Sequence, residues 1–179
     1  MSALRRTKEA LDRALAWTLA MAMIGSVLVV LWQVLGRYVL KSPSSFTDEL
    51  VRYVLIWIGL LGGAQAAGRR LHLAIDLLPE RLAPPARHRL GAFNQILIAV
   101  FALAVLGLGG GSLVHLTFAL GQRSAALGLP LGWVYLVLPL SGVLIAFYAT
   151  MFAWDHLRQA RGEPPLLADP STATDGELS

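Results

Sequence analysis

Four long apolar stretches constrain this chain more than any other feature. Ala14 to Gly36 has no ionisable residue, Ser124 to Trp154 has no charge, and only His115 interrupts Leu90 to Gln122. Tyr53 to Gly68 is a shorter apolar run. Since a helix needs about 20 apolar residues to cross the hydrocarbon core, the pattern predicts an all-α membrane protein with four transmembrane helices. We expect these spans at about residues 14–36, 49–68, 93–118 and 131–154.

The composition agrees with a membrane setting. Hydrophobic residues make up 56% of the chain and charged residues only 15%, where a soluble domain carries about 25% charged residues. The mean hydropathy is +0.61. The chain has no cysteine, which excludes disulfides, thiolate metal sites and cysteine nucleophiles.

The distribution of basic residues predicts the orientation. An even number of spans puts both termini on one side of the membrane. Eleven Lys and Arg residues fall on that side, in the two tails and the connection between spans two and three, against four on the other side. This positive-inside bias predicts that both termini are cytoplasmic. The basic residues are accordingly interpreted as topology signals and contacts to membrane lipids, and no nucleic-acid partner is expected.

The regions outside the spans divide the chain further. Residues 1–13 are expected to be a cytoplasmic tail, residues 14–157 the four-helix membrane domain with an uncleaved first span, and residues 158–179 a disordered cytoplasmic tail rich in Pro, Ser and Thr. Between spans two and three, apolar residues recur at helical spacing from Leu71 to Leu82, with His72 and Asp76 among them. We expect an amphipathic connector helix on the cytoplasmic surface, although the same letters also alternate as in a strand.

The second span opens with three ionisable residues, Asp48, Glu49 and Arg52. Asp48 and Arg52 are spaced i, i+4, so they can pair along one helix face. Across the short connection, Arg37 closes the first span. We therefore predict a contact between Glu49 and Arg37 at the outer rim, with snorkelling of these side chains to the interface as the alternative.

Small residues mark a candidate helix-packing face. Gly59 and Gly63 are four residues apart, and Gly107 and Gly111 repeat the spacing. Small residues on one face let helix backbones approach closely in lipid. The glycine- and alanine-rich second half of span two is therefore expected to be buried against protein. Pro139 lies inside the fourth span and should bend it.

The sequence contains no motif that indicates catalysis or cofactor binding by this chain. The chain has no nucleophile elbow, zinc-protease motif or nucleotide-binding loop, so no enzymatic activity, metal or cofactor is expected. Bis-histidine haem ligation, as in a small membrane cytochrome b, is the alternative, with His72 and His115 as candidates. These two residues fall at opposite ends of their spans, too far apart for one iron, and His88 and His156 are expected on the solvated surface. A membrane assembly factor is a further alternative.

The region after the first span resembles a known family. Gly36-Arg37-Tyr38 closes span one, and FTDELVRYVLIWIGLLGGAQAAGRRLHLAID follows. The order of residues is similar to that of the small permease subunit of tripartite ATP-independent periplasmic (TRAP) transporters, the DctQ-like family, from about Leu11 to Leu157. The matching positions here are Phe46, where Trp is usual, Asp48-Glu49, Arg52-Tyr53, Trp57, Gly62 to Ala67, Arg70, His72 and Asp76.

The resemblance implies a structural role in a transporter, without catalysis. In such transporters a large permease subunit holds the substrate and sodium sites, and the small subunit packs against its stationary scaffold. A soluble periplasmic substrate-binding protein delivers a carboxylate-type solute, and sodium supplies the energy. The resemblance implies that Arg37, Glu49 and Arg52 fix the outer end of the helix hairpin and that His72 and Asp76 pin the connector. Candidate partner-interface residues are Trp57, Gly59 and Gly63.

Overall fold

The computed structural model describes residues 3–39, 41, 45–69 and 84–163, and these residues are predominantly helical. In chain order the elements are α1 (Ala3–Tyr38), α2 (Ser45–Gly68), α3 (Pro84–Phe101), the π-helical segment η2 (Ala102–Gly109), α4 (Gly110–Ala119), α5 (Leu131–Tyr135) and α6 (Val137–Ala160). They form four rods long and apolar enough to cross a membrane. The expected all-α fold with four transmembrane helices is confirmed.

The helices extend beyond the expected spans. Helix α1 begins at Ala3, so most of the expected N-terminal tail is helical, and α6 continues to Ala160. Each expected span lies inside one rod, while the exact membrane boundaries stay predictions. The expected connector helix, with His72 and Asp76, lies outside the described residues, as do residues 164–179 of the expected C-terminal tail.

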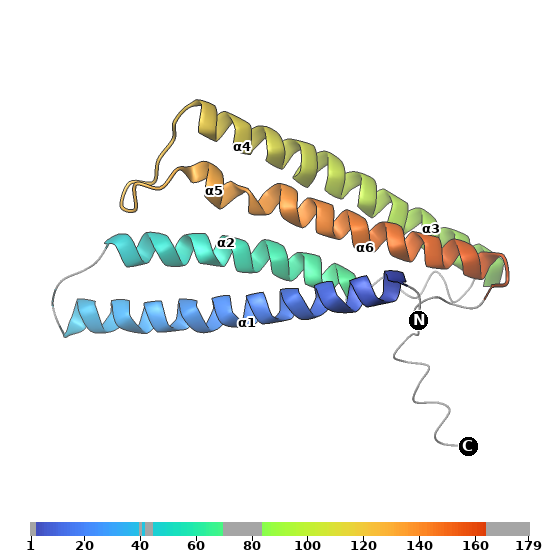
Figure 1. The fold of residues 1–179 in the computed structure, drawn as a ribbon, viewed down its shortest axis with the longest axis horizontal. Helices are drawn as coiled ribbons and strands as arrows, with labels where there is room; N and C mark the ends of the chain where they lie inside the picture. Colours follow the sequence, from blue (N-terminus) through green and yellow to red (C-terminus); the bar gives the residue numbers. More distant parts are fainter. Residues whose placement is uncertain (1–2, 40, 42–44, 70–83, 164–179) are drawn as a thin grey trace, which may run out of the picture.

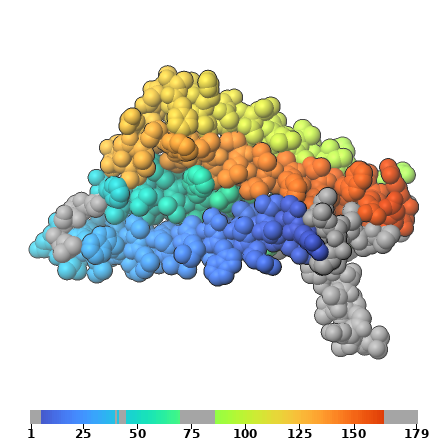
Figure 2. Space-filling model, in the orientation of Figure 1, coloured from blue at the N-terminus to red at the C-terminus, as the bar shows by residue number. Residues whose placement is uncertain are grey.

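The four rods lie in a row instead of closing into a compact bundle (Figure 1). Helix α1 packs on α2, α2 packs on α6, and α6 packs on α3 and η2. The row is wedge-shaped, broad at the end with the α4–α5 loop and narrow where α3 and α6 meet (Figure 2). In the most apolar 18-residue stretch of the fourth rod, half of the residues are buried within the chain. In the corresponding stretch of the first rod, 11% are buried. Helix α6 is therefore the centre of the fold, and α1 is attached along one side.

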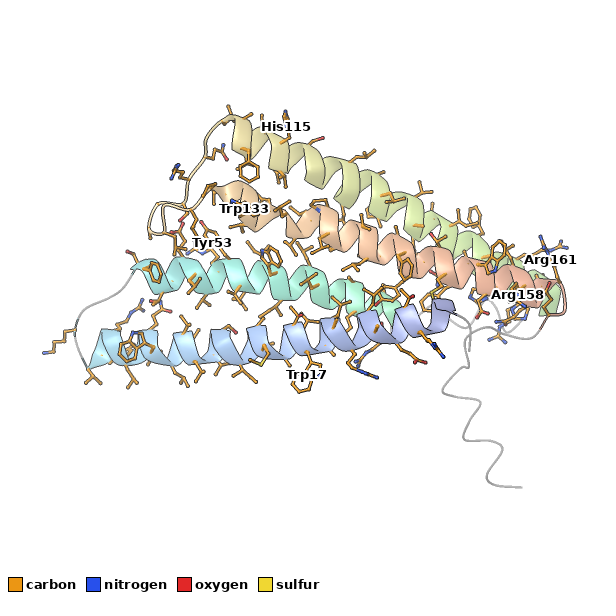
Figure 3. All side chains as sticks on the ribbon, in the orientation of Figure 1. Trp17, Tyr53, His115, Trp133, Arg158 and Arg161 are labelled. Carbon is orange, nitrogen blue, oxygen red and sulfur yellow. The ribbon has the colours of Figure 1, made fainter. Side chains whose placement is uncertain are left out.

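A small core holds α1, α2 and α6 together. Its buried members are Leu15, Leu61, Val137, Tyr148 and Phe152. The apolar side chains of α1 otherwise point mostly outward, as Trp17 does (Figure 3). In a soluble protein such exposure would be costly, but a bilayer removes that cost.

Two of the rods are irregular. Pro139 was predicted to bend the fourth rod, and the helix is interrupted at Leu136, between α5 and α6. Proline lacks an N–H for the carbonyl of Tyr135, and its ring clashes with that carbonyl. In the third rod, the π-helical η2 lies against Gly142 of α6. A Cβ added at Gly142 would lie 2.8 Å from the Gly107 backbone nitrogen.

Candidate functional site

A half-buried carboxylate, that of Glu49, lies near the start of α2. The Glu49 carboxylate accepts hydrogen bonds from the Tyr53 hydroxyl at 2.6 Å and the Ser124 hydroxyl at 2.8 Å. It also accepts from the backbone N–H groups of Ala126 at 2.7 Å and Leu127 at 3.1 Å. We call these five residues the carboxylate clasp. It ties the first turn of α2 to the loop between α4 and α5.

The α4–α5 loop has a fixed shape that aims its amides at Glu49. Gly121 and Gly128 adopt positive φ angles of 60° and 65°, which glycine tolerates because it has no Cβ. The Ser124 N–H donates to the carbonyl of Leu129 at 2.8 Å. Successive backbone N–H groups in such a turn form a concave anion site. Here the anion is a side chain of the same protein.

The neighbouring acid faces the other way. Arg52 pairs with Asp48 at 3.0 Å, which confirms the predicted i, i+4 pair. The Gln33 amide of α1 donates to Asp48 at 3.3 Å. Consecutive helical residues point about 100° apart, so Asp48 faces α1 while Glu49 faces the α4–α5 loop.

The predicted contact between Glu49 and Arg37 is wrong. The carboxylate is occupied by the donors of the carboxylate clasp on the side of α2 turned away from α1. Arg37 is exposed in the last turn of α1 and forms no hydrogen bond or ion pair with a described residue. The link between α1 and α2 at this end runs through Gln33 and Asp48 instead.

Trp57 continues the same face of α2 toward the membrane interior. Glu49, Tyr53 and Trp57 follow at intervals of four residues, so they lie on one face. The Trp57 indole N–H donates to the carbonyl of Val134 in α5 at 3.1 Å. This carbonyl lies just before the interruption at Leu136. The structure therefore assigns Trp57 to contacts within the chain, and Figure 3 places Tyr53 and Trp133 at this end of the row.

A second polar cluster lies at the opposite end of the row, and it was not predicted. The hydroxyl of Tyr148, a residue with no exposed surface, donates to Asp12 of α1 at 2.7 Å. Lys8 pairs with the other oxygen of Asp12 at 2.7 Å. The Tyr148 ring lies over Gly68, where an added Cβ would be 2.8 Å from the ring. The i, i+4 spacing of Lys8 and Asp12 was a signal for the ion pair, but nothing local pointed to Tyr148.

Only some of the glycine and alanine residues in the second half of α2 are buried. Ala64 and Ala67 are buried within the chain, as expected for the small-residue half of the span. Gly59 and Gly63, however, are exposed, and no atom lies within 4 Å of a Cβ added at either. The residues that the structure describes therefore leave this part of α2 uncovered.

The other predicted glycine pair borders a hollow. Gly107, Gly111 and His115 line a shallow depression of about 600 Å³ on the outer side of η2 and α4. Figure 3 shows His115 on the side of α4 turned away from α5. His88 and His156, expected on the solvated surface, are instead partly buried, with ring centroids 6.1 Å apart.

Comparison with known proteins gives one consistent result. A model of the DctQ component of tripartite ATP-independent periplasmic transporters matches residues 26–159. The sialic acid TRAP transporter small permease protein SiaQ of Vibrio cholerae is 29% identical over 130 residues, which cover 70% of this chain and 70% of that protein. The C4-dicarboxylate TRAP transporter small permease protein DctQ of Rhodobacter capsulatus is 28% identical over 120 residues, or 67% of this chain and 52% of that protein.

One similar protein is much longer than this chain. The sialic acid TRAP transporter permease protein SiaT of Haemophilus influenzae is 26% identical over 137 residues. The match covers 76% of this chain and 21% of that protein, so this chain spans about a fifth of its length. The matches are to transporter components, and they do not favour the haem-protein alternative.

Proposed function

The chain belongs to the DctQ component family of tripartite ATP-independent periplasmic transporters, and on that premise we propose that it scaffolds a larger permease subunit during solute uptake. It is a small permease subunit and a multi-pass inner-membrane protein. In this proposal the large subunit holds the solute and sodium sites. A periplasmic binding protein delivers the solute, and both termini of this chain are cytoplasmic.

The observation that carries the proposal is the uncovered part of α2. Gly59 and Gly63 are exposed and have open space above them. In lipid, helices associate through close backbone contact at small residues. A helix of the larger subunit is the occupant that this surface fits, since the chain's own helices cover the other side of α2.

The lack of acidic residues in the apolar runs supports this division of roles between the subunits. The apolar runs 14–36, 53–68, 93–118 and 131–154 contain no Asp or Glu. Ion-coupled carriers usually place ionisable groups or broken helices at the membrane midplane. The interruption at Leu136 lies one turn and a half into its helix, near the clasp end, and not at mid-span.

The similar proteins support a partner and a class of solute. SiaT carries the matching region in 21% of its length, which is consistent with a large subunit that functions together with this region. The names of similar proteins give sialic acid, C4-dicarboxylates and isethionate as solutes. All three are organic anions, and the first two are carboxylates, so we propose a carboxylate-type solute.

The first experiment tests the uncovered face of α2. Gly59→Leu and Gly63→Leu have room within the chain, so they should leave its fold intact while blocking the approach of a partner helix. We expect several-fold less large permease subunit to co-purify in mild detergent and a matching loss of solute uptake by cells. Solute binding by the isolated periplasmic protein should not change.

Ala20→Leu is the matched control. Ala20 lies on α1 and is exposed, so the substitution adds the same side chain to a surface of another helix. Subunit yield should stay at the wild-type level. Wild-type yield and uptake in both α2 variants would contradict the proposed scaffold.

A further inference from the structure

An apolar groove runs between α1 and α2, below the Gln33–Asp48 link. Its volume is about 260 Å³. Ser26 is the polar residue in its lining, and its hydroxyl already donates to the carbonyl of Met23 at 2.8 Å. The lining residues are Ala22, Gly25, Ser26, Val29, Leu50, Val51 and Val54. With its polar group satisfied, the groove offers nothing to hold water and should take an apolar occupant.

Cationic side chains lie beyond the mouth of this groove. Val29, Gln33 and Arg37 follow at intervals of four, so they share one face of α1. Arg37 is exposed and has no hydrogen-bond or ion-pair partner among the described residues. Arg52 of α2 is also exposed, although it pairs with Asp48. Arg37 therefore lies about two helical turns beyond Val29, and it has no anionic partner among the residues that the structure describes.

We propose that this groove binds one phospholipid, with an acyl chain between α1 and α2 and the phosphate held by Arg37. Both helices are membrane spans, so the acyl chains of the bilayer surround the groove. The guanidinium group matches a phosphate in geometry and charge. A phospholipid satisfies both the apolar groove and the Arg37 guanidinium group, for which the described residues supply no anion.

The spacing along α1 suits such a molecule. Eight residues separate Val29 from Arg37, which corresponds to about 12 Å of helix. Helical side chains lean toward the N-terminus of their helix. For Arg37 this direction leads back toward Gln33 and the groove, which shortens the gap between the guanidinium group and the first acyl carbons.

The inference rests on the membrane location of the chain and is independent of the scaffold role. A partner helix could also fill an apolar groove, but it would have to carry an acidic residue at the right height to supply an anion for Arg37. The Gly59–Gly63 surface and this groove lie on different parts of α2, because the groove involves Leu50, Val51 and Val54. Occupancy of one can therefore be tested without disturbing the other.

Native mass spectrometry of the full-length chain, with any subunits that co-purify, measures the bound lipid. We expect the wild type to retain one phospholipid in mild detergent and to rebind palmitoyl-oleoyl phosphatidylglycerol after delipidation. Gly25→Leu fills open space in the groove and should reduce the bound fraction at least about tenfold, since several methylenes lose their contacts. Val27→Leu, at an exposed position of α1 outside the groove, should retain the lipid.

Arg37→Gln tests the headgroup. It should weaken phosphatidylglycerol binding and remove the preference for this lipid over diacylglycerol with the same chains. Glycerol phosphate alone should not bind, because the apolar groove supplies most of the affinity. Binding of glycerol phosphate with wild-type affinity, or an unchanged lipid preference in the variant, would overturn the assignment of the phosphate to Arg37.

A photoreactive lipid provides a second measurement that needs no variant. Phosphatidylglycerol with a diazirine in its acyl chain should label peptides containing residues 22–29 or 50–54 in the wild type. Labelling spread evenly over all four rods would overturn the proposal, as would full lipid retention by Gly25→Leu. Cross-linking from Gly25→Cys to another protein chain, in a protein with no other cysteine, would make the occupant a protein and also refute it.

Discussion

At the scale of single residues, adjacent positions on α2 have different partners. Asp48 links to Gln33 and Arg52, whereas Glu49 binds the α4–α5 loop. The i, i+4 spacing predicted the Asp48–Arg52 pair because both residues belong to one helix. The partners of Glu49 could not be predicted in this way. Ser124 is 75 residues away in sequence, and backbone amides leave no signature in the amino-acid sequence.

Replacing Glu49 tests the carboxylate clasp. Glu49→Gln removes the charge and turns an N–H₂ group toward donors that need an acceptor. We expect a lower melting temperature, faster proteolysis of the α4–α5 loop, and reduced yield of the assembled complex with reduced uptake. Thermal unfolding and limited proteolysis in detergent measure the first two effects.

Asp48→Asn is the matched control for Glu49→Gln. The pair of Asp48 and Arg52 is exposed, and exposed ion pairs contribute about 0.2 to 1 kcal/mol. Its loss should therefore have a small effect on the melting temperature. An equal or larger drop for Asp48→Asn would remove the special role of Glu49.

At the scale of helices, length and apolar composition predicted the four spans, and Pro139 predicted an irregularity in the fourth, which is interrupted at Leu136. The π-helical η2, which lies against α6, was not predicted. Gly142 approaches the backbone of η2 and the Leu106 side chain, each 2.8 Å from where a Cβ would be. The sequence contains the glycine, but the helix that it meets is known only from the fold.

Gly142→Ala tests this close contact. The added methyl group would collide with backbone atoms of η2, which cannot rotate away. Overpacking of this kind costs typically 1–3 kcal/mol, so we expect destabilisation in that range, measured by unfolding in mixed micelles. Gly111→Ala has open space and should be neutral or stabilise the helix by up to about 1 kcal/mol. Equal stability of the two variants would contradict the packing role of Gly142.

At the scale of the whole molecule, the sequence predicted the number of spans but not their arrangement in a row. In lipid, surfaces that face acyl chains and surfaces that face protein are both apolar, so hydropathy does not separate them. The cluster of Lys8, Asp12 and Tyr148 was not predicted because it depends on where α1 lies relative to α6. Only small or polar residues left uncovered, such as Gly59 and Gly63, distinguish a protein-facing surface.

The orientation of the molecule is testable because the chain has no cysteine. Gln122→Cys places a thiol in the α4–α5 loop, and Arg161→Cys places one just after α6. The positive-inside bias predicts that a membrane-impermeant maleimide labels the Gln122 variant in intact cells with a permeabilised outer membrane. The Arg161 variant should react only after the inner membrane is lysed. The reverse labelling pattern would place both termini in the periplasm.

The use of main-chain donors in the carboxylate clasp has an evolutionary consequence. Ala126 and Leu127 bind Glu49 through their amides, and any residue other than proline supplies the same group. The amino acids at these two positions are therefore free to drift among descendants. An insertion or deletion between Gly121 and Gly128, by contrast, would displace both donors at once, so selection should preserve the length of this loop more strictly than its side chains.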